Sequence, residues 1–228
     1  MTSSAFFRIA PFATYMAFLA LEQGLRYLNV KGYVTIPEGF LMSLYPVKAL
    51  SVALLLIFFR KSYTEIRVKD MCERFVFPAS FFAGIVVFLI WINMDFPAAV
   101  MGTLHGFDPN VARDGTLRLS LTISRLAGAA LVVPIMEELF WRSFLIRYVI
   151  SNDYSKVAIG HFTLTSFLVT AVLFGLEHNL FLAGIIAGLI YNLLLYYTRS
   201  LTACIVAHGI TNLALGIYVL MTGKWYFW

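Results

Sequence analysis

Long apolar stretches separated by short polar segments run along the whole chain. Several of them cover roughly 17–22 residues, the length that a helix needs to cross the hydrocarbon core of a bilayer at about 1.5 Å per residue. The short alternating segments of a membrane β-barrel do not occur. The pattern therefore predicts an all-α fold, a polytopic transmembrane bundle of about seven to eight helices, over residues of about 10–29, 39–60, 75–93, 117–149, 162–178, 180–198 and 201–222.

The fourth apolar stretch is too long for a simple span. It contains Pro134, which lacks a backbone N–H and belongs to a residue type that commonly kinks a helix. A break at this proline would divide the stretch into two helices and give eight in total. An unbroken helix would give seven.

Composition supports a lipid environment. Of the 228 residues, 61% are hydrophobic and 13% are charged, whereas charged residues make up about a quarter of a typical soluble domain. No internal repeat or low-complexity tract divides the chain. We therefore expect residues 1–228 to form a single membrane-embedded domain.

The positive charges are concentrated in the loop after the second predicted helix. The formal net charge is +5, but this clustering does not indicate a soluble basic face that would bind nucleic acid. By the positive-inside tendency the loop is cytoplasmic. The N-terminus is then cytoplasmic as well, and the loop that contains Arg113 lies outside. The clustered cations are Arg60, Lys61, Arg67, Lys69 and Arg74.

Both ends of the chain are expected to lie at the membrane. The first apolar run, residues 9–21, follows Arg8 and could be mistaken for a signal peptide. It lacks an A-x-A site and continues into Glu22 and Arg26, an i,i+4 pair, so we interpret it as a retained helix. The last aromatic residues are typical of an anchor near the lipid headgroups. They are Trp225, Tyr226 and Trp228.

Small residues recur along the sixth predicted helix at a spacing that lets two helix backbones approach closely. We interpret this pattern as helix packing. The residues are Ala183, Gly184, Ala187 and Gly188.

Two adjacent carboxylates, Glu137 and Glu138, lie in the apolar fourth stretch. An ionisable residue inside lipid costs about 2.5–3.5 kcal/mol on insertion scales, so such residues normally face the bundle interior and have a function. Neighbouring helical residues point about 100° apart, whereas Glu138 and Arg142 at i,i+4 share a face. Arg142 is therefore expected to hold Glu138, which leaves Glu137 available as a general base.

Two histidines accompany these carboxylates in later apolar stretches. His178 ends the fifth predicted helix, four residues after Phe174, and His208 precedes Asn212 by four residues on the seventh. The i,i+4 spacing of His208 and Asn212 presents an imidazole and an amide side by side. Two such donors suit a developing oxyanion.

Each group also has a plain structural interpretation. A single membrane histidine often only bonds one helix to another, and Glu138 with Arg142 could be a packing salt bridge. Together, however, five groups on three helices offer more hydrogen-bonding capacity than internal pairing needs, which favours a functional site. Other polar residues are interpreted as peripheral or interfacial: His105, His161 and Glu177.

Three motifs in the C-terminal half resemble those of the intramembrane CAAX-protease and bacteriocin-processing superfamily, also called the Abi family, which includes the type II CAAX prenyl endopeptidases. The resemblance covers about residues 117–222, which we take as the catalytic helical core. EExxxR is matched by Glu137, Glu138 and Arg142, FxxxH by Phe174 and His178, and HxxxN/D by His208 and Asn212.

The resemblance implies an intramembrane endopeptidase without a cofactor, acting on a membrane-associated peptide or protein. Glu137 and His178 would activate a water, and His208 with Asn212 would stabilise the oxyanion. Glu138 is included among the catalytic residues, with Arg142 and Phe174 in support. The helix layout is also similar to a bacterial subgroup associated with exosortase-type sorting, which implies the bacterial inner membrane.

Two alternatives stay open. Two histidines and a glutamate can form a catalytic zinc site, with Glu137, His178 and His208 as ligands, although the H-E-x-x-H spacing is missing. The chain could also be a noncatalytic scaffold or immunity protein. Intact Glu137, His178 and His208 argue against that reading. A transporter is less favoured because paired internal repeats are not found.

The predicted depths of the site residues differ. Counted from the cytoplasmic turns at about 1.5 Å per residue, Glu138 lies roughly 18 Å deep, His178 roughly 24 Å and His208 roughly 10 Å. These side chains can meet only if helices tilt or break, and ordinary tilts of about 20° or a kink at Pro134 would bring them together.

Overall fold

The computed structural model describes residues 3–104, 106–112 and 114–228, and its regular secondary structure is entirely helical there. His105 and Arg113 lie outside the described residues. The helices are α1 Ser3–Val30, α2 Glu38–Phe58, α3 Val76–Trp91, α4 Gly115–Ala127, α5 Val133–Glu138, α6 Ile146–Tyr148, α7 Leu164–Leu176, α8 Phe181–Thr198 and α9 Leu201–Thr222. The predicted all-α fold is confirmed.

The long fourth stretch stays helical from Gly115 to Tyr148. Two π-helical segments, Gly128–Val132 and Leu139–Leu145, connect α4, α5 and α6. The first ends immediately before α5, which has Pro134 in its first turn. A π-helical turn shifts the hydrogen-bond ladder by one residue, so the missing N–H of the proline does not divide the helix. The alternative of two separate helices is therefore wrong.

In the part of the chain that the structure describes, five helices are long and apolar enough to cross a membrane, namely α1, α2, the continuous stretch α4–α6, α8 and α9. The chain is therefore an integral membrane protein. The apolar helices α3 and α7 are shorter, with 16 and 13 residues. Helix α7 ends at Leu176 instead of reaching residue 178 as predicted, so His178 lies in the turn that follows it.

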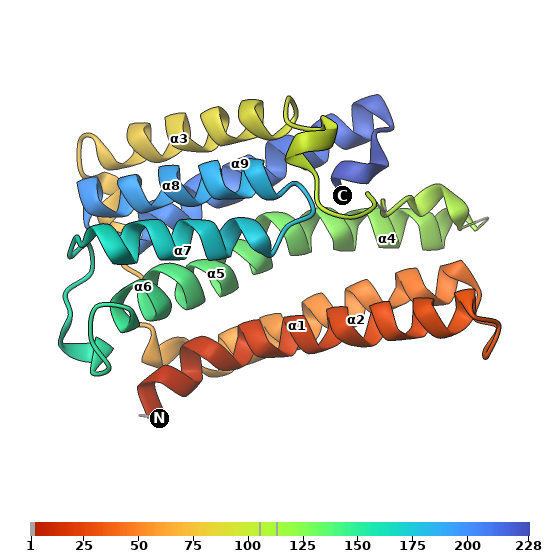
Figure 1. Ribbon diagram of the computed structural model, residues 1–228, viewed down its shortest axis with the longest axis horizontal. Helices are drawn as coiled ribbons and strands as arrows, with labels where there is room; N and C mark the ends of the chain where they lie inside the picture. The colour runs from red at the N-terminus through yellow and green to blue at the C-terminus, as the bar shows by residue number, and fades with distance from the viewer. Residues whose placement is uncertain (1–2, 105, 113) are drawn as a thin grey trace.

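Figure 1 shows α1 and α2 as an antiparallel pair along one side, with α3, α7, α8 and α9 on the other and α4–α6 running between them. Two of the small residues of α8, Gly184 and Gly188, face α7. A Cβ atom built on Gly188 would lie 2.9 Å from Cα of Ala171, and one built on Gly184 would lie 2.9 Å from Cα of Gly175. The packing interpretation of this pattern is confirmed, since Ala183 and Ala187 are also buried.

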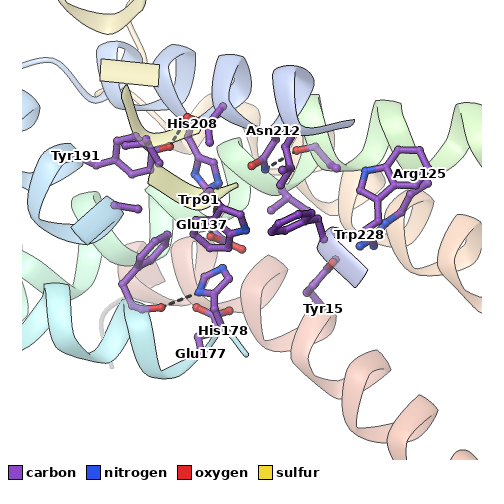
Figure 2. A pocket seen from close by; sticks show the side chains of 18 of the residues that line it. Tyr15, Trp91, Arg125, Glu137, Glu177, His178, Tyr191, His208, Asn212 and Trp228 are labelled. Carbon is purple, nitrogen blue, oxygen red and sulfur yellow. Dashed lines mark hydrogen bonds and ion pairs between the residues drawn. The ribbon is translucent and has the colours of Figure 1, made fainter. Parts of the chain in front are cut away.

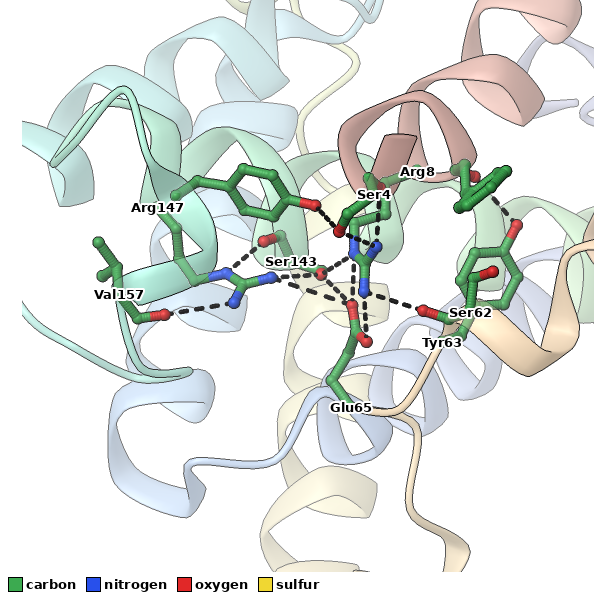
Figure 3. A network of polar contacts seen from close by, with 10 residues as sticks. Ser4, Arg8, Ser62, Tyr63, Glu65, Ser143, Arg147 and Val157 are labelled. Atoms are coloured by element: carbon green, nitrogen blue, oxygen red, sulfur yellow. Dashed lines mark hydrogen bonds and ion pairs between the residues drawn. The ribbon is translucent and has the colours of Figure 1, made fainter. Parts of the chain in front are cut away.

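The N-terminal helix begins at Ser3, not near residue 10, and Arg8 is buried inside the bundle. Its guanidinium donates to both carboxylate oxygens of Glu65 at 2.7 Å and to Oγ of Ser143 at 2.9 Å. Ser143 also donates to Glu65, and Arg147 donates to Ser143 (Figure 3). This network joins α1, the α2–α3 connection and the end of the long helix.

Glu65 lies outside the membrane-spanning helices. Its burial opposes ionisation, but hydrogen bonds from Arg8 and Ser143 outweigh that effect and hold the pKa of Glu65 below its ordinary value. Arg8 is therefore not a flanking surface charge. It is one half of a buried ion pair that fixes the start of α1.

We predict that Glu65→Gln lowers the free energy of unfolding by about 2–3 kcal/mol at neutral pH, because Arg8 then stays buried without a counter-charge. Since folding lowers the pKa of Glu65, the stabilisation is complete above its ordinary pKa of 4.5 and is lost as the pH falls toward the folded-state pKa. Denaturant unfolding in detergent should show the difference from wild type shrinking on acidification.

Glu73→Gln is the matched control, because Glu73 is an exposed carboxylate of the same connection. This change should shift stability by less than about 0.5 kcal/mol. A Glu65→Gln protein as stable as the control at neutral pH would contradict the buried ion pair.

Candidate active site

The two carboxylates of the first motif are buried where α5 passes into the second π-helical segment. Glu138 is 0% exposed, and Nη1 of Arg142 lies 3.2 Å from its Oε1, so the predicted pairing is confirmed. Arg142 also donates from Nε to Oδ1 of Asn192 at 3.2 Å, and its guanidinium lies 4.4 Å from the ring centre of Phe174. These contacts hold Arg142 between α8 and α7.

His208 comes from α9 to the same carboxylate. Its Nδ1 lies 2.9 Å from Oε1 of Glu138, and its Nε2 lies 4.0 Å from Oε2 of Glu137. The ring stacks on Tyr191, whose hydroxyl donates to Oγ1 of Thr211 at 2.7 Å. Glu138 therefore orients His208 and leaves Nε2 on the side of Glu137. The contact also shows that the difference in predicted depth does not keep these helices apart.

His178 is oriented from the turn after α7. Its Nδ1 lies 2.8 Å from the backbone oxygen of Phe174, and its ring meets Trp91 edge-on at 5.3 Å. A carbonyl oxygen only accepts hydrogen bonds, so Nδ1 carries the hydrogen in this contact. In the neutral imidazole the lone pair is then on Nε2. The FxxxH spacing thus fixes the histidine through the backbone of Phe174.

A cavity of about 220 Å³ brings the three motifs together, lined among others by Glu137, His178, His208 and Asn212. Figure 2 shows Glu137 between the rings of His178 and His208, with Asn212 farther along the same wall. Asn212 donates from Nδ2 to the backbone oxygen of Ala129 at 2.9 Å. Oε2 of Glu137 is buried without a hydrogen-bond partner among the described residues.

Glu177 is not peripheral, so that interpretation is wrong. It lines the cavity, and its Oε2 accepts a hydrogen bond from Nε1 of Trp141 at 3.1 Å. The cause is the early end of α7, which turns Glu177 inward beside His178. In the sequence, the position of Glu177 next to His178 was the one feature that indicated a place at the site. His161, in contrast, is exposed and is not among the residues that line this cavity, as expected.

Trp228 is not a surface anchor either. It is 8% exposed and packs with Phe227 and Leu215 at the end of the cavity farther from His178. Tyr15 and Arg125 also line the cavity. The sequence did not single out these last two residues, because nothing local in the chain shows that α1 and α4 approach the motifs.

A zinc ion would fit this site only if the side chains of Glu137, His178 and His208 converge on one point. No group of three His, Cys, Asp or Glu side chains is arranged to hold a metal ion within the ranges 3–104, 106–112 and 114–228. Nδ1 of His208 contacts Glu138 and Nδ1 of His178 contacts the backbone of Phe174, so each ring has only Nε2 left for a ligand. Glu137, His178 and His208 share the cavity but do not form a ready zinc site as they stand. The expectation of no cofactor stays a prediction.

Comparison with known proteins adds a separate observation. Residues 119–214 match the model of the family described as Type II CAAX prenyl endopeptidase Rce1-like. This segment contains all three motifs, so the resemblance to the endopeptidase family is confirmed for it. No significant match was found among curated proteins or among solved structures. The likeness to the exosortase-associated subgroup stays a prediction.

The Glu138–Arg142 pair generates a prediction about stability. Arg142→Gln should lower the free energy of unfolding by about 3–5 kcal/mol, because it leaves Glu138 as a buried charge without a cation. The double variant Glu138→Gln/Arg142→Gln contains no unpaired charge and should be more stable than Arg142→Gln alone. Unfolding of wild type, Arg142→Gln, Glu138→Gln and the double variant in detergent gives the coupling energy. If the losses of unfolding free energy in the two single variants sum to the loss in the double variant, the ion pair is contradicted.

Proposed function

We propose, from the family match over residues 119–214 and the geometry of the cavity, that the chain is an intramembrane endopeptidase that hydrolyses a peptide bond of a membrane-associated substrate. The observation that carries the proposal is the meeting of Glu137 and His178 across one cavity that also presents His208 and Asn212. Such a set offers a base, a second proton acceptor and oxyanion donors without a serine or cysteine nucleophile.

Water activation is assigned to Glu137 and His178. Oε2 of Glu137 is a buried acceptor without a hydrogen-bond partner among the described residues, and Nε2 of His178 has its lone pair free while Nδ1 donates to Phe174. A water between them can be held by both acceptors and lose a proton to one of them. The resulting hydroxide attacks the carbonyl carbon of the peptide bond.

Oxyanion stabilisation is assigned to His208 and Asn212. Nδ1 of His208 is engaged with Glu138, so Nε2 is the nitrogen available to the substrate, and this role requires a proton on it. Asn212 uses one hydrogen of Nδ2 for Ala129 and retains the other. The proton taken from water then passes to the leaving amine, which completes the hydrolysis.

Glu138 and Arg142 act through His208 in this mechanism. Glu138 holds the imidazole as the carboxylate of a catalytic triad does, and Arg142 neutralises Glu138 in the apolar interior. Both residues are positioning groups. Phe174 contributes its backbone oxygen to His178 and its ring to Arg142.

A zinc mechanism uses the same residues differently, with Glu137, His178 and His208 as ligands and the metal supplying a Lewis acid. We favour the mechanism without metal because Glu137, His178 and His208 are not gathered in an arrangement that could hold a metal ion within the described residues. A noncatalytic role is disfavoured because all three motifs are present and meet in one cavity.

The proposal predicts that Glu137→Gln reduces kcat by about 10²–10⁴-fold, the usual loss when a general base is removed. The change preserves the shape of the side chain, so the protein should stay folded. Cleavage can be measured as new N-termini that appear by mass spectrometry when purified protein in proteoliposomes is mixed with a library of membrane peptides.

Glu73→Gln serves as the control, because its carboxylate is exposed and is not among the residues that line this cavity. It should cleave at the wild-type rate. Full peptide hydrolysis by Glu137→Gln protein would overturn the mechanism, and absence of cleavage by the wild type across the library would overturn the proposed activity.

A further inference from the structure

The catalytic cavity continues toward the turn between α1 and α2. A second hollow of about 460 Å³ shares five lining residues with it: Tyr15, Leu19, Tyr45, Arg125 and Trp228. Beyond these shared residues its walls carry charged side chains, namely Glu22, Arg26, Glu38 and Lys48. A substrate held at Glu137 can therefore extend into a charged compartment within the bundle.

Two cations lie over one tyrosine ring where the hollows join. Nζ of Lys48 lies 5.2 Å from the ring centre of Tyr45, and the guanidinium of Arg125 lies 4.4 Å from it. Lys48 is only 3% exposed although it lies in the membrane-spanning helix α2. Cation–π contact compensates part of the cost of burying these charges, but the two cations repel each other.

The surrounding carboxylates do not neutralise this pair. Glu22 lies 3.1 Å from Arg26 and 3.9 Å from Lys48, and Glu38 lies 2.7 Å from Arg26. Arg125 forms no ion pair with the described residues, and its buried Nε has no hydrogen-bond partner there. Among the charged side chains that line this second hollow, three cations face two carboxylates, so one positive charge is left over there.

A further donor lies at the same junction. Nε1 of Trp228 is buried without a hydrogen-bond partner among the described residues, and Trp228 lines both hollows. Figure 2 shows Trp228 between Asn212 and Arg125. Buried cations and donors without partners are costly inside a membrane protein, and a ligand that supplies the missing acceptor removes the cost.

We propose that the Lys48–Arg125 end of the cavity is an anion subsite that binds a carboxylate group of the substrate. A single excess positive charge matches a monoanion, and a guanidinium with an indole N–H can hold both oxygens of a carboxylate. The proposal rests on the proposed peptidase function. The subsite would fix the distance between the substrate's carboxylate and the bond that meets Glu137.

The carboxylate can be a chain terminus or an acidic side chain, and three probes separate these sources. They are an N-acetylated apolar hexapeptide with a free C-terminal carboxylate, the same peptide as its amide, and an amide with glutamate as the last residue. All carry the same fluorophore. Binding is measured as fluorescence anisotropy with Glu137→Gln protein in zwitterionic nanodiscs, so that no cleavage is needed.

We expect the free acid, or the glutamate amide, to bind about tenfold more tightly than the plain amide, a difference of about 1.4 kcal/mol. Whichever carboxylate probe binds more tightly identifies the source of the anion. Adding Arg125→Gln or Lys48→Met should reduce this preference to about twofold or less and leave binding of the plain amide unchanged.

Arg118→Gln is the matched control, because it removes an exposed cation of the same helix α4 that lines neither hollow. It should keep the preference. Equal binding of all three probes, or a preference that survives both Arg125→Gln and Lys48→Met in folded protein, would overturn the subsite. A carboxylate preference in the Glu137→Gln protein, together with no peptide cleavage by the wild type, would instead overturn the proposed function alone.

Discussion

The chain of contacts from Arg142 through Glu138 to His208 determines how the rest of the site is arranged. It joins the long helix to α9, while Asn192 and Phe174 tie Arg142 to α8 and α7. Because Glu138 is fully buried, it is stable as a charge only while both partners are present. Glu137, one residue earlier, is thereby turned into the cavity, so structural support and the proposed chemistry depend on the same short segment.

The sequence predicted the features that depend on local spacing. The apolar stretches predicted the helices, the i,i+4 spacing predicted the contact of Glu138 with Arg142, and the small residues of α8 predicted close helix packing, although not that α7 is the partner. Contacts between distant segments could not be predicted this way. The bond between Glu138 and His208 depends on how α9 lies against the long helix, and the inward turn of Glu177 depends on the end of α7 at Leu176.

Charges inside the bundle fall into two groups. Arg8 with Glu65, and Arg142 with Glu138, have matched partners and hold helices together. Lys48 and Arg125 lack a full set of counter-charges and face a cavity that continues from the site. In a low-dielectric interior this difference separates charges that stabilise the fold from charges that are available to a ligand.

The metal content of active protein tests the central claim most directly, because Glu137 and His178 serve as water-activating groups in one mechanism and as ligands in the other. Elemental analysis of purified, active protein should be paired with its His178→Ala variant. We predict activity without a stoichiometric metal. About one zinc per chain, lost in the variant and needed to restore activity to stripped wild-type protein, would contradict the account.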